Sequence, residues 1–226
     1  MNFNWKSSVF ININRLFIIL FFLSLLVLNS CSIFFPEPYG YVSADTKRIR
    51  KNSNRVFIPK NAPSVLNGFK PMENKESLFQ VDSGHNGIDI IEKKGTPVIS
   101  PAKGRVIRSS YGITYGHTLV ISHGKGPDGL FIKTRYYHLN KRLVQKGDMV
   151  IRGQQIGELG RTGFLSGGIL HLHFEVWGSK TQDLRYAKPF NPHRFWYDGL
   201  GIVTCFDTQR QYDDISFKTT YPVKCI

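Results

Sequence analysis

The stretch of sequence that decides the fold is residues 171–177, His171-Leu172-His173-Phe174-Glu175-Val176-Trp177. Polar and apolar residues alternate strictly, which is typical of a half-buried β-strand. The alternation predicts that Leu172, Phe174 and Val176 face the core and that the other four side chains share the opposite face. Histidines two residues apart on a strand stand roughly 7 Å apart, so one ring can bind a metal while the other reaches a substrate. A pair of surface histidines on an edge strand is the alternative for this motif alone.

A second set of candidate ligands lies in His85-Asn86-Gly87-Ile88-Asp89. In an extended chain His85 and Asp89 would lie about 13 Å apart, too far to share one ion. Asn-Gly is a strong turn signal, and a turn there with Asp89 opening a strand would bring both side chains onto one ion. A simple hairpin turn with an incidental histidine explains these residues equally well when they are taken alone.

The rest of the chain predicts an all-β domain. Short apolar or alternating segments bounded by Gly, Pro, Asn or Asp predict strands at 64–69, 96–100, 104–108, 118–122 and 131–138. No helical stripe of useful length follows residue 35. We therefore expect antiparallel sheets packed as a small sandwich or barrel-like domain with a groove and little helix. Within the last strand, His138 should share a face with Tyr136, opposite Tyr137 and Leu139.

The N-terminus predicts export. Lys6 and Arg15 provide a positive region, and the apolar run Leu16–Leu28 is broken only by Ser24. This run fits a secretory signal and is short for a membrane span of about 20 residues. The sequence Leu28-Asn29-Ser30-Cys31 resembles a bacterial lipoprotein signal, in which Cys31 would be lipidated. An ordinary cleaved signal and an uncleaved anchor are the alternatives, and all three place the remainder outside the cytoplasm.

Charge and cysteine content agree with an exported protein. The formal net charge is +14, with a basic cluster at 47–51 that fits a tether near anionic headgroups or a solvated linker. A nucleic-acid partner would rest on charge alone and conflicts with export. Cys205 and Cys225 suggest one disulfide, with two unpaired thiols as the alternative. No Gly-x-Ser-x-Gly elbow is present, which argues against a serine hydrolase of that type.

Several motifs occur together in a characteristic order: His85-x-Gly-x-Asp89, Gly95-Thr96-Pro97-Val98, Tyr137-His138-Leu139, the glycine turns of 147–157, and His171-Leu172-His173-Phe174-Glu175. Over about residues 62–178 this order closely resembles the lysostaphin/LytM-type zinc endopeptidases of bacterial cell walls. Two details depart from that pattern. The loop Ser166-Gly-Gly-Ile-Leu is one residue longer than usual, and His117 stands where the family often has Asn.

The resemblance implies that His85, Asp89 and His173 bind zinc. His138 and His171 would line the site as general base and as stabiliser of the tetrahedral intermediate, and the sequence leaves their division of labour open. Two histidines and one carboxylate leave a fourth position open, which is typical of catalytic zinc. Glu175 could orient a ligand or be a plain surface carboxylate.

We therefore expect a zinc endopeptidase that hydrolyses peptide cross-links of peptidoglycan. The alternative is a catalytically silent domain that binds cell wall or activates an amidase. A biotinyl or lipoyl carrier domain is disfavoured, because the chain has no tight turn that carries a modifiable lysine. The expected regions are a lipoprotein signal at 1–30, a lipid-anchored basic tether at 31–61, the peptidase domain at 62–190 and a C-terminal extension at 191–226. The protein would be anchored to a membrane in the cell envelope, at the outer membrane if that envelope is Gram-negative. The sequence leaves open the bond that is cut, the oligomeric state and any activator.

Overall fold

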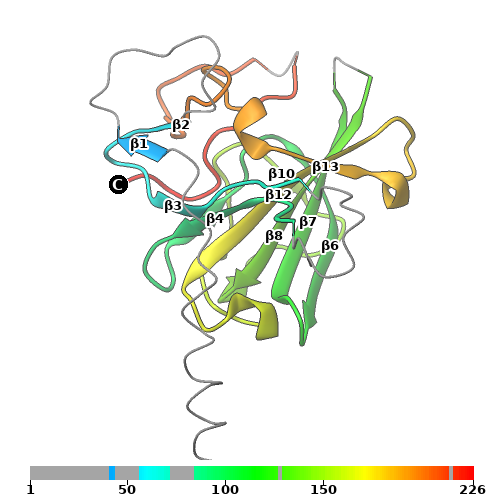
Figure 1. Cartoon of the computed structure of the whole chain (residues 1–226). Coiled ribbons are helices and arrows are strands. Elements are labelled where there is room, and N and C mark those ends of the chain that lie inside the picture. The colour runs from blue at the N-terminus through cyan, green and yellow to red at the C-terminus, as the bar shows by residue number, and fades with distance from the viewer. Residues whose placement is uncertain (1–40, 44–55, 72–83, 127–128, 214–215) are drawn as a thin grey trace, which may run out of the picture. The chain divides into compact units, whose positions relative to one another are not determined.

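The structure is a computed structural model that describes residues 41–43, 56–71, 84–126, 129–213 and 216–226 (Figure 1). The chain divides into two compact units, Met1–Glu37 and Pro38–Ile226, and the described residues all belong to the second. The predicted signal, Cys31 and the basic cluster at 47–51 lie outside the described residues. No helix in the described part of the chain is long and apolar enough to cross a membrane.

An eight-stranded sheet forms the body of the domain (Figure 1). Its strands follow the order β10-β6-β7-β8-β12-β4-β3, and β13 pairs with the end of β12. All these pairings are antiparallel. The strands are β3 (Ser64–Asn67), β4 (Ile88–Ile91), β6 (Gly104–Gly112), β7 (Gly116–Lys125), β8 (Phe131–Leu139), β10 (Met149–Val150), β12 (His171–Ser179) and β13 (Lys188–Phe190).

A second sheet of three short strands has the order β5-β11-β9. It consists of β5 (Pro97–Ile99), β9 (Lys141–Arg142) and β11 (Gln155–Glu158). A separate parallel pair joins β1 (Tyr41–Ser43) to β2 (Val56–Ile58). The helices within the described residues are three-residue 3-10 turns, namely η2 (Phe164–Ser166), η3 (Leu184–Tyr186) and η4 (Pro192–Arg194). The prediction of an all-β, mainly antiparallel fold is therefore confirmed, and β6 and β7 run longer than predicted.

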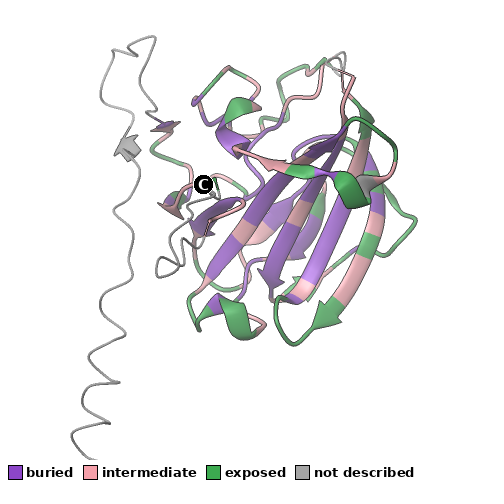
Figure 2. Cartoon of the chain, turned by 45° about the vertical axis from the view of Figure 1, so that its right-hand side comes forward, coloured by how far each residue is buried: buried purple, intermediate pink, exposed green. Residues whose placement is uncertain are grey.

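Alternation along the strands separates the core from the open face of the larger sheet. Leu172, Phe174 and Val176 are fully buried, as predicted, in a cluster that also holds Leu119 of β7 and Ile156 of β11. This cluster joins the two sheets, and Figure 2 shows buried residues along the central strands and exposed ones mainly in the loops. The hydrophobic effect of this burial is the main force that stabilises such a sandwich.

The predicted alternation at the end of β8 is wrong. Tyr136 and Leu139 both belong to the core, whereas Tyr137 and His138 pack their rings against His173. His138 has a φ of 64°, in the left-handed region, and no other described residue besides glycine has a positive φ. This backbone conformation interrupts the period of two, so Leu139 returns to the core after His138 has faced the other way.

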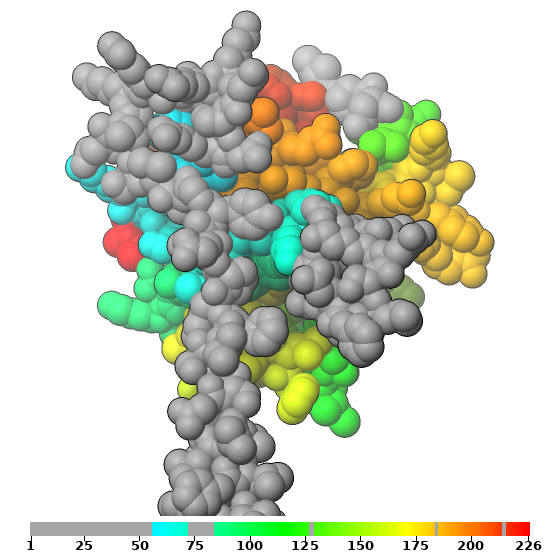
Figure 3. Space-filling view, viewed as in Figure 1, coloured from blue at the N-terminus to red at the C-terminus, as the bar shows by residue number. Residues whose placement is uncertain are grey.

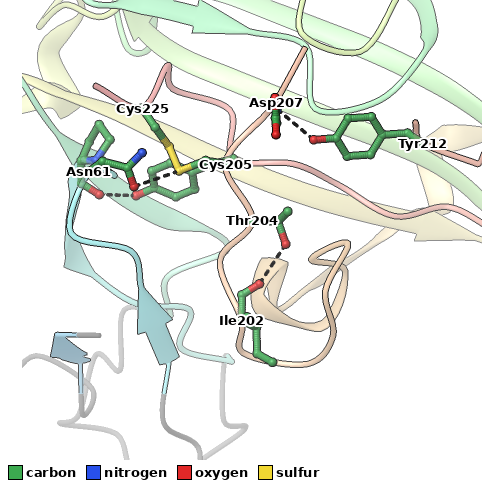
Figure 4. Close-up of a disulfide and its surroundings, with 9 residues drawn as sticks. Asn61, Ile202, Thr204, Cys205, Asp207, Tyr212 and Cys225 are labelled. Atoms are coloured by element: carbon green, nitrogen blue, oxygen red, sulfur yellow. Dashed lines mark hydrogen bonds between the residues drawn. A yellow bond between two sulfur atoms is a disulfide. The ribbon is translucent and has the colours of Figure 1, made fainter. Parts of the chain in front are cut away.

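The C-terminal residues pack against the rest of the described domain (Figures 1 and 3). Trp196, Tyr221 and Val223 are buried in the core cluster. Backbone hydrogen bonds join 219–224 to the strand and turn at 97–101: Ile99 N–H donates to Pro222 O, Thr220 N–H to Pro101 O and Lys224 N–H to Pro97 O. The structure joins Cys205 to Cys225 by a disulfide, with a Cα–Cα distance of 5.9 Å (Figure 4).

Candidate metal centre

Strand register places two of the predicted ligands, Asp89 and His173, side by side. Antiparallel pairing of β12 with β4 sets His173 opposite Asp89, and pairing of β12 with β8 sets His173 opposite Tyr137. Because their neighbours Leu172 and Ile90 enter the core, Asp89 and His173 share the open face of the sheet. The His173 ring lies 5.6 Å from the ring of Tyr137, which forms one wall of the site.

The bend before β4 brings His85 to the same place. His85 pairs with Lys70 in an isolated antiparallel bridge, and the chain then bends at Gly87 before Asp89 enters β4. Gly87 is essential to this approach because a Cβ built on it would lie 2.2 Å from the carbonyl oxygen of Phe174. The glycine of the His-x-Gly-x-Asp motif thus lets the bend press against β12. The prediction that His85 and Asp89 come together is confirmed, but the chain makes only a bend at Gly87 and no hairpin turn.

Three ligand atoms converge at this point. Asp89 Oδ1 lies 2.7 Å from His173 Nδ1 and 3.1 Å from His85 Nε2, and the two nitrogens are 3.1 Å apart. Around a tetrahedral zinc ion with bonds of about 2.0–2.1 Å, neighbouring ligand atoms lie about 3.3 Å apart. The triangle therefore has nearly the size that one zinc ion requires.

The second polar atom of each ligand side chain, the one outside the triangle, has its own hydrogen-bond partner. His85 Nδ1 lies 2.6 Å from the carbonyl oxygen of Gly68 and His173 Nε2 lies 3.1 Å from Glu175 Oε1, so each of these nitrogens carries the proton and donates. Asn67 Nδ2 donates to Asp89 Oδ2 at 2.9 Å. When both rings are neutral, these bonds leave the lone pairs of His85 Nε2 and His173 Nδ1 facing each other and Asp89 Oδ1. Such outer hydrogen bonds are the usual way in which proteins orient metal-binding histidines.

Electrostatics also favour a cation at this point. Burial alone would raise the pKa of Asp89, but hydrogen bonds from His173 and His85 outweigh it and hold that pKa well below its usual range. Burial alone would lower the pKa of His173, but hydrogen bonds to Asp89 and Glu175 raise it to about 9. Asp89 and Glu175 thus stabilise positive charge on this cluster, and a bound zinc ion would supply that charge in place of the imidazole protons. The residues present therefore fit a bound zinc ion.

His138 reaches the site from the end of β8. Its Nδ1 lies 2.9 Å from the carbonyl oxygen of Thr162 and donates to it, which leaves Nε2 as the unprotonated nitrogen. Burial lowers the pKa of His138 to about 4. The positive φ of His138 is an unfavourable conformation of the kind found at functional sites. His138 is therefore a neutral side chain held in place as a proton acceptor.

His171 lies beside His138, with ring centroids 4.8 Å apart. Its Nδ1 donates to the carbonyl oxygen of Ile169, and its Nε2 lies 3.8 Å from Asp89 Oδ1. Burial lowers its pKa as well. The structure thus brings together all five predicted residues, with three forming the triangle and two beside it.

Some residues of the site were weakly signalled or not signalled by the sequence. Glu175 could be read as a surface carboxylate, but it is buried and accepts hydrogen bonds from His173 and from Trp177 Nε1. The signal in the sequence was its position two residues after His173.

The sequence gave no signal for Thr162. Its carbonyl oxygen orients His138, and its hydroxyl oxygen accepts a hydrogen bond from the backbone N–H of His117. His117 itself contacts Arg142, whose Nε donates to His117 Nδ1.

Comparison with known proteins matches this arrangement to a family. Residues 83–191 match peptidase family M23, and this range contains the three converging ligands and both flanking histidines. The C-terminal residues that pack on the sheets extend beyond the matched range.

The proteins that this chain resembles include some named as enzymes and some named as activators. The chain is 37% identical over 145 residues to the peptidoglycan DD-endopeptidase ShyB of Vibrio cholerae, an alignment that covers 64% of this chain and 32% of ShyB. It is 35% identical over 121 residues to the murein hydrolase activator NlpD of Escherichia coli, covering 51% and 30% of the two chains. The chain therefore spans a third or less of the length of these relatives.

A solved structure is also similar to part of this chain. It is described as a zinc-containing peptidase from Vibrio cholerae and is 36% identical, with a TM-score of 0.46 over 58% of this chain and 38% of that one.

Proposed function

We propose that this chain is a zinc-dependent endopeptidase that hydrolyses peptide cross-links of bacterial peptidoglycan. The observation that carries this proposal is the triangle of His85 Nε2, Asp89 Oδ1 and His173 Nδ1 with two neutral histidines beside it. Three protein ligands leave one position open for water or substrate, as in catalytic rather than structural zinc sites. The similarity to ShyB, named as a peptidoglycan DD-endopeptidase, supports the same substrate class.

The residues of the site have roles that fit peptide hydrolysis. Zinc bound by His85, Asp89 and His173 would lower the pKa of a water to about 7 and polarise a peptide carbonyl. His138 and His171 each hold a proton on Nδ1, through the carbonyl oxygens of Thr162 and Ile169, so each presents an unprotonated Nε2. One Nε2 would accept a proton from the attacking water, and the other histidine, when protonated, would donate to the oxyanion.

A murein hydrolase activator without turnover is the second candidate, because NlpD is a relative of similar identity. The presence of all five site residues favours the enzyme. His138→Ala separates the two: as an enzyme, the purified chain should lose cross-link cleavage in this variant while its zinc content stays at one ion per chain. If wild-type protein with full zinc content cleaves nothing but stimulates an amidase, the activator assignment replaces ours.

We also propose that the chain is an exported lipoprotein held in the cell envelope through Cys31 and the basic tether. This rests on the sequence of 1–61. Expression with radiolabelled palmitate should label the wild-type chain and not Cys31→Ala. Equal labelling of both would show that the anchor lies elsewhere, and absence of label from both would favour an ordinary signal peptide.

A further inference from the structure

A groove of about 500 Å³ lies on the open face of the larger sheet, next to the metal centre. Tyr115 and Tyr137 form its end nearest the ligands, with ring centroids 4.7 Å apart, and the ring of Tyr137 also contacts His173. From there the groove extends over β8, β7 and β6. A peptide whose scissile bond lies at the metal centre would thus continue into this groove.

The charged side chains that line the groove are all basic among the described residues. They are Arg108 of β6 and Lys133 and Arg135 of β8. Lys133 and Arg135 precede Tyr137 on β8 and share its face, because each lies two residues from the next along the strand. The register sets them opposite Trp177 and Glu175 of β12, just as Tyr137 lies opposite His173. The nearest carboxylate, Glu175, lies 3.5 Å from Arg135 but also binds His173 and Trp177. Asp183 also acts on the charge of Lys133 but is paired with Arg185, so the groove keeps a net positive charge.

The three cations are held in different ways. The Arg135 guanidinium stacks on Trp177, with 4.0 Å between Cζ and the ring centroid, and donates to Tyr137 Oη at 3.3 Å. Lys133 is buried, and burial together with the charge of Arg135 lowers its pKa to about 8. Arg108 is exposed and donates from Nε to Ser110 Oγ. A fixed guanidinium near the metal and a more open one across the groove suit a ligand with spaced carboxylates.

We propose that this groove binds the free carboxylates of anionic stem peptides next to the cross-link, with Arg135 and Arg108 as the specificity-determining cations. The inference rests on the proposed function and narrows it. An uncharged bridge such as polyglycine offers no anionic group to these cations, so it would desolvate them without adding a compensating charge. The chain therefore selects cross-links between carboxylate-bearing stems over uncharged bridges.

Binding is tested apart from cleavage. Zinc-loaded His138→Ala protein is titrated calorimetrically with two synthetic stem tetrapeptides that differ only in free or amidated carboxylates. We expect the free form to bind about 10-fold more tightly, and Arg108→Gln to reduce this preference to about 3-fold or less. Arg105→Gln is the matched control, because Arg105 is an exposed arginine of the same strand that donates to Gly147 O and is not among the residues that line the groove. Equal affinity for the two peptides, or equal effects of the two substitutions, would overturn the inference.

A second arm separates this inference from the proposed function. Wild-type protein is incubated with cross-linked dimers in free and amidated form. A binding preference without hydrolysis of any dimer would contradict the endopeptidase and leave the groove assignment standing. Hydrolysis of both dimers at equal kcat/KM, without a binding preference, would support the endopeptidase and refute the groove assignment.

Discussion

At the scale of single residues, the site depends on one glycine that carries no chemistry. Gly87→Ala would place a methyl group 2.2 Å from Phe174 O, a backbone atom that cannot move without disturbing β12. The bend holding His85 must then shift away from Asp89 and His173. We expect at least a 10-fold loss of zinc affinity, measured by competition with a chromophoric chelator. Gly112→Ala is the control, because nothing lies within 4 Å of its added Cβ; similar losses in both variants would refute the explanation.

Glu175 is predicted to act on the metal through His173. Its carboxylate accepts the Nε2–H of His173, which fixes the tautomer that leaves Nδ1 free for the ion. Outer-shell substitutions of this kind typically cost 10–100-fold in metal affinity. Glu175→Ala should therefore weaken zinc binding by about that factor, with a smaller loss for Glu175→Gln, which keeps an acceptor oxygen. Glu92→Ala, at a carboxylate bound only to the neighbouring backbone N–H of Lys93 among the described contacts, should have no effect. Unchanged affinity in Glu175→Ala would return this residue to a purely structural role.

At the scale of elements, the disulfide anchors the C-terminal segment. Cys205 and Cys225 close a loop with a sequence separation of 20, which in the chain-entropy model contributes about 3 kcal/mol to the free energy of unfolding. The Cys205→Ser/Cys225→Ser variant should lose about that much in urea unfolding. Reducing agent should destabilise the wild-type protein by a similar amount and leave the double variant unchanged. A reductant effect on the double variant would show that the loss has another cause.

The 3-10 turn η4 carries a buried histidine that predicts a pH dependence. His193 accepts a hydrogen bond from Trp196 Nε1 at 2.9 Å, and burial lowers its pKa from 6.5 to about 4. Since the unfolded chain then binds a proton at higher pH than the folded chain, this residue makes stability fall as pH drops from about 6.5 to about 4. The slope from one such group is at most about 1.4 kcal/mol per pH unit.

His193→Gln keeps an acceptor for Trp196 and removes the titration. The difference in unfolding free energy between wild type and variant should therefore change between pH 6.5 and 4 and stay constant between pH 7 and 8. Urea unfolding at a series of pH values measures it. A difference that is constant across the whole range would show that His193 does not titrate differently in the folded and unfolded chains.

Most of the strands could be predicted from the sequence, because alternation and turn residues are local signals. The histidine strand and the antiparallel sheets were predicted in this way and are confirmed, whereas Asn86-Gly87 forms a bend and not the predicted turn. The alternation at the end of β8 could not be predicted, since the left-handed φ of His138 depends on the distant Thr162 carbonyl and the packing around it. The contact of Glu175 with Arg135 likewise depends on register across the sheet, which a single strand does not reveal.

At the scale of the whole molecule, residues before and after 83–191, the range that matches peptidase family M23, complete the described domain. β3 pairs with β4 and supplies Asn67 to Asp89, while the C-terminal segment adds Trp196, Tyr221 and Val223 to the core. The packing of that segment follows from long-range contacts that the sequence alone does not locate. It means that the domain requires both flanking segments for its full stability, in addition to the site residues within 83–191.

The central claim is that the triangle of His85, Asp89 and His173 holds a zinc ion needed for cleavage of peptidoglycan cross-links. The most direct test is to incubate the purified chain with isolated peptidoglycan and to follow muropeptides by mass spectrometry, first as isolated, then after chelation, then after addition of one equivalent of zinc. We expect cross-linked dimers to be converted to monomers, the conversion to stop on chelation, and zinc to restore it. Conversion that persists after zinc has been removed, or its absence in protein that contains one zinc ion per chain, would contradict the claim.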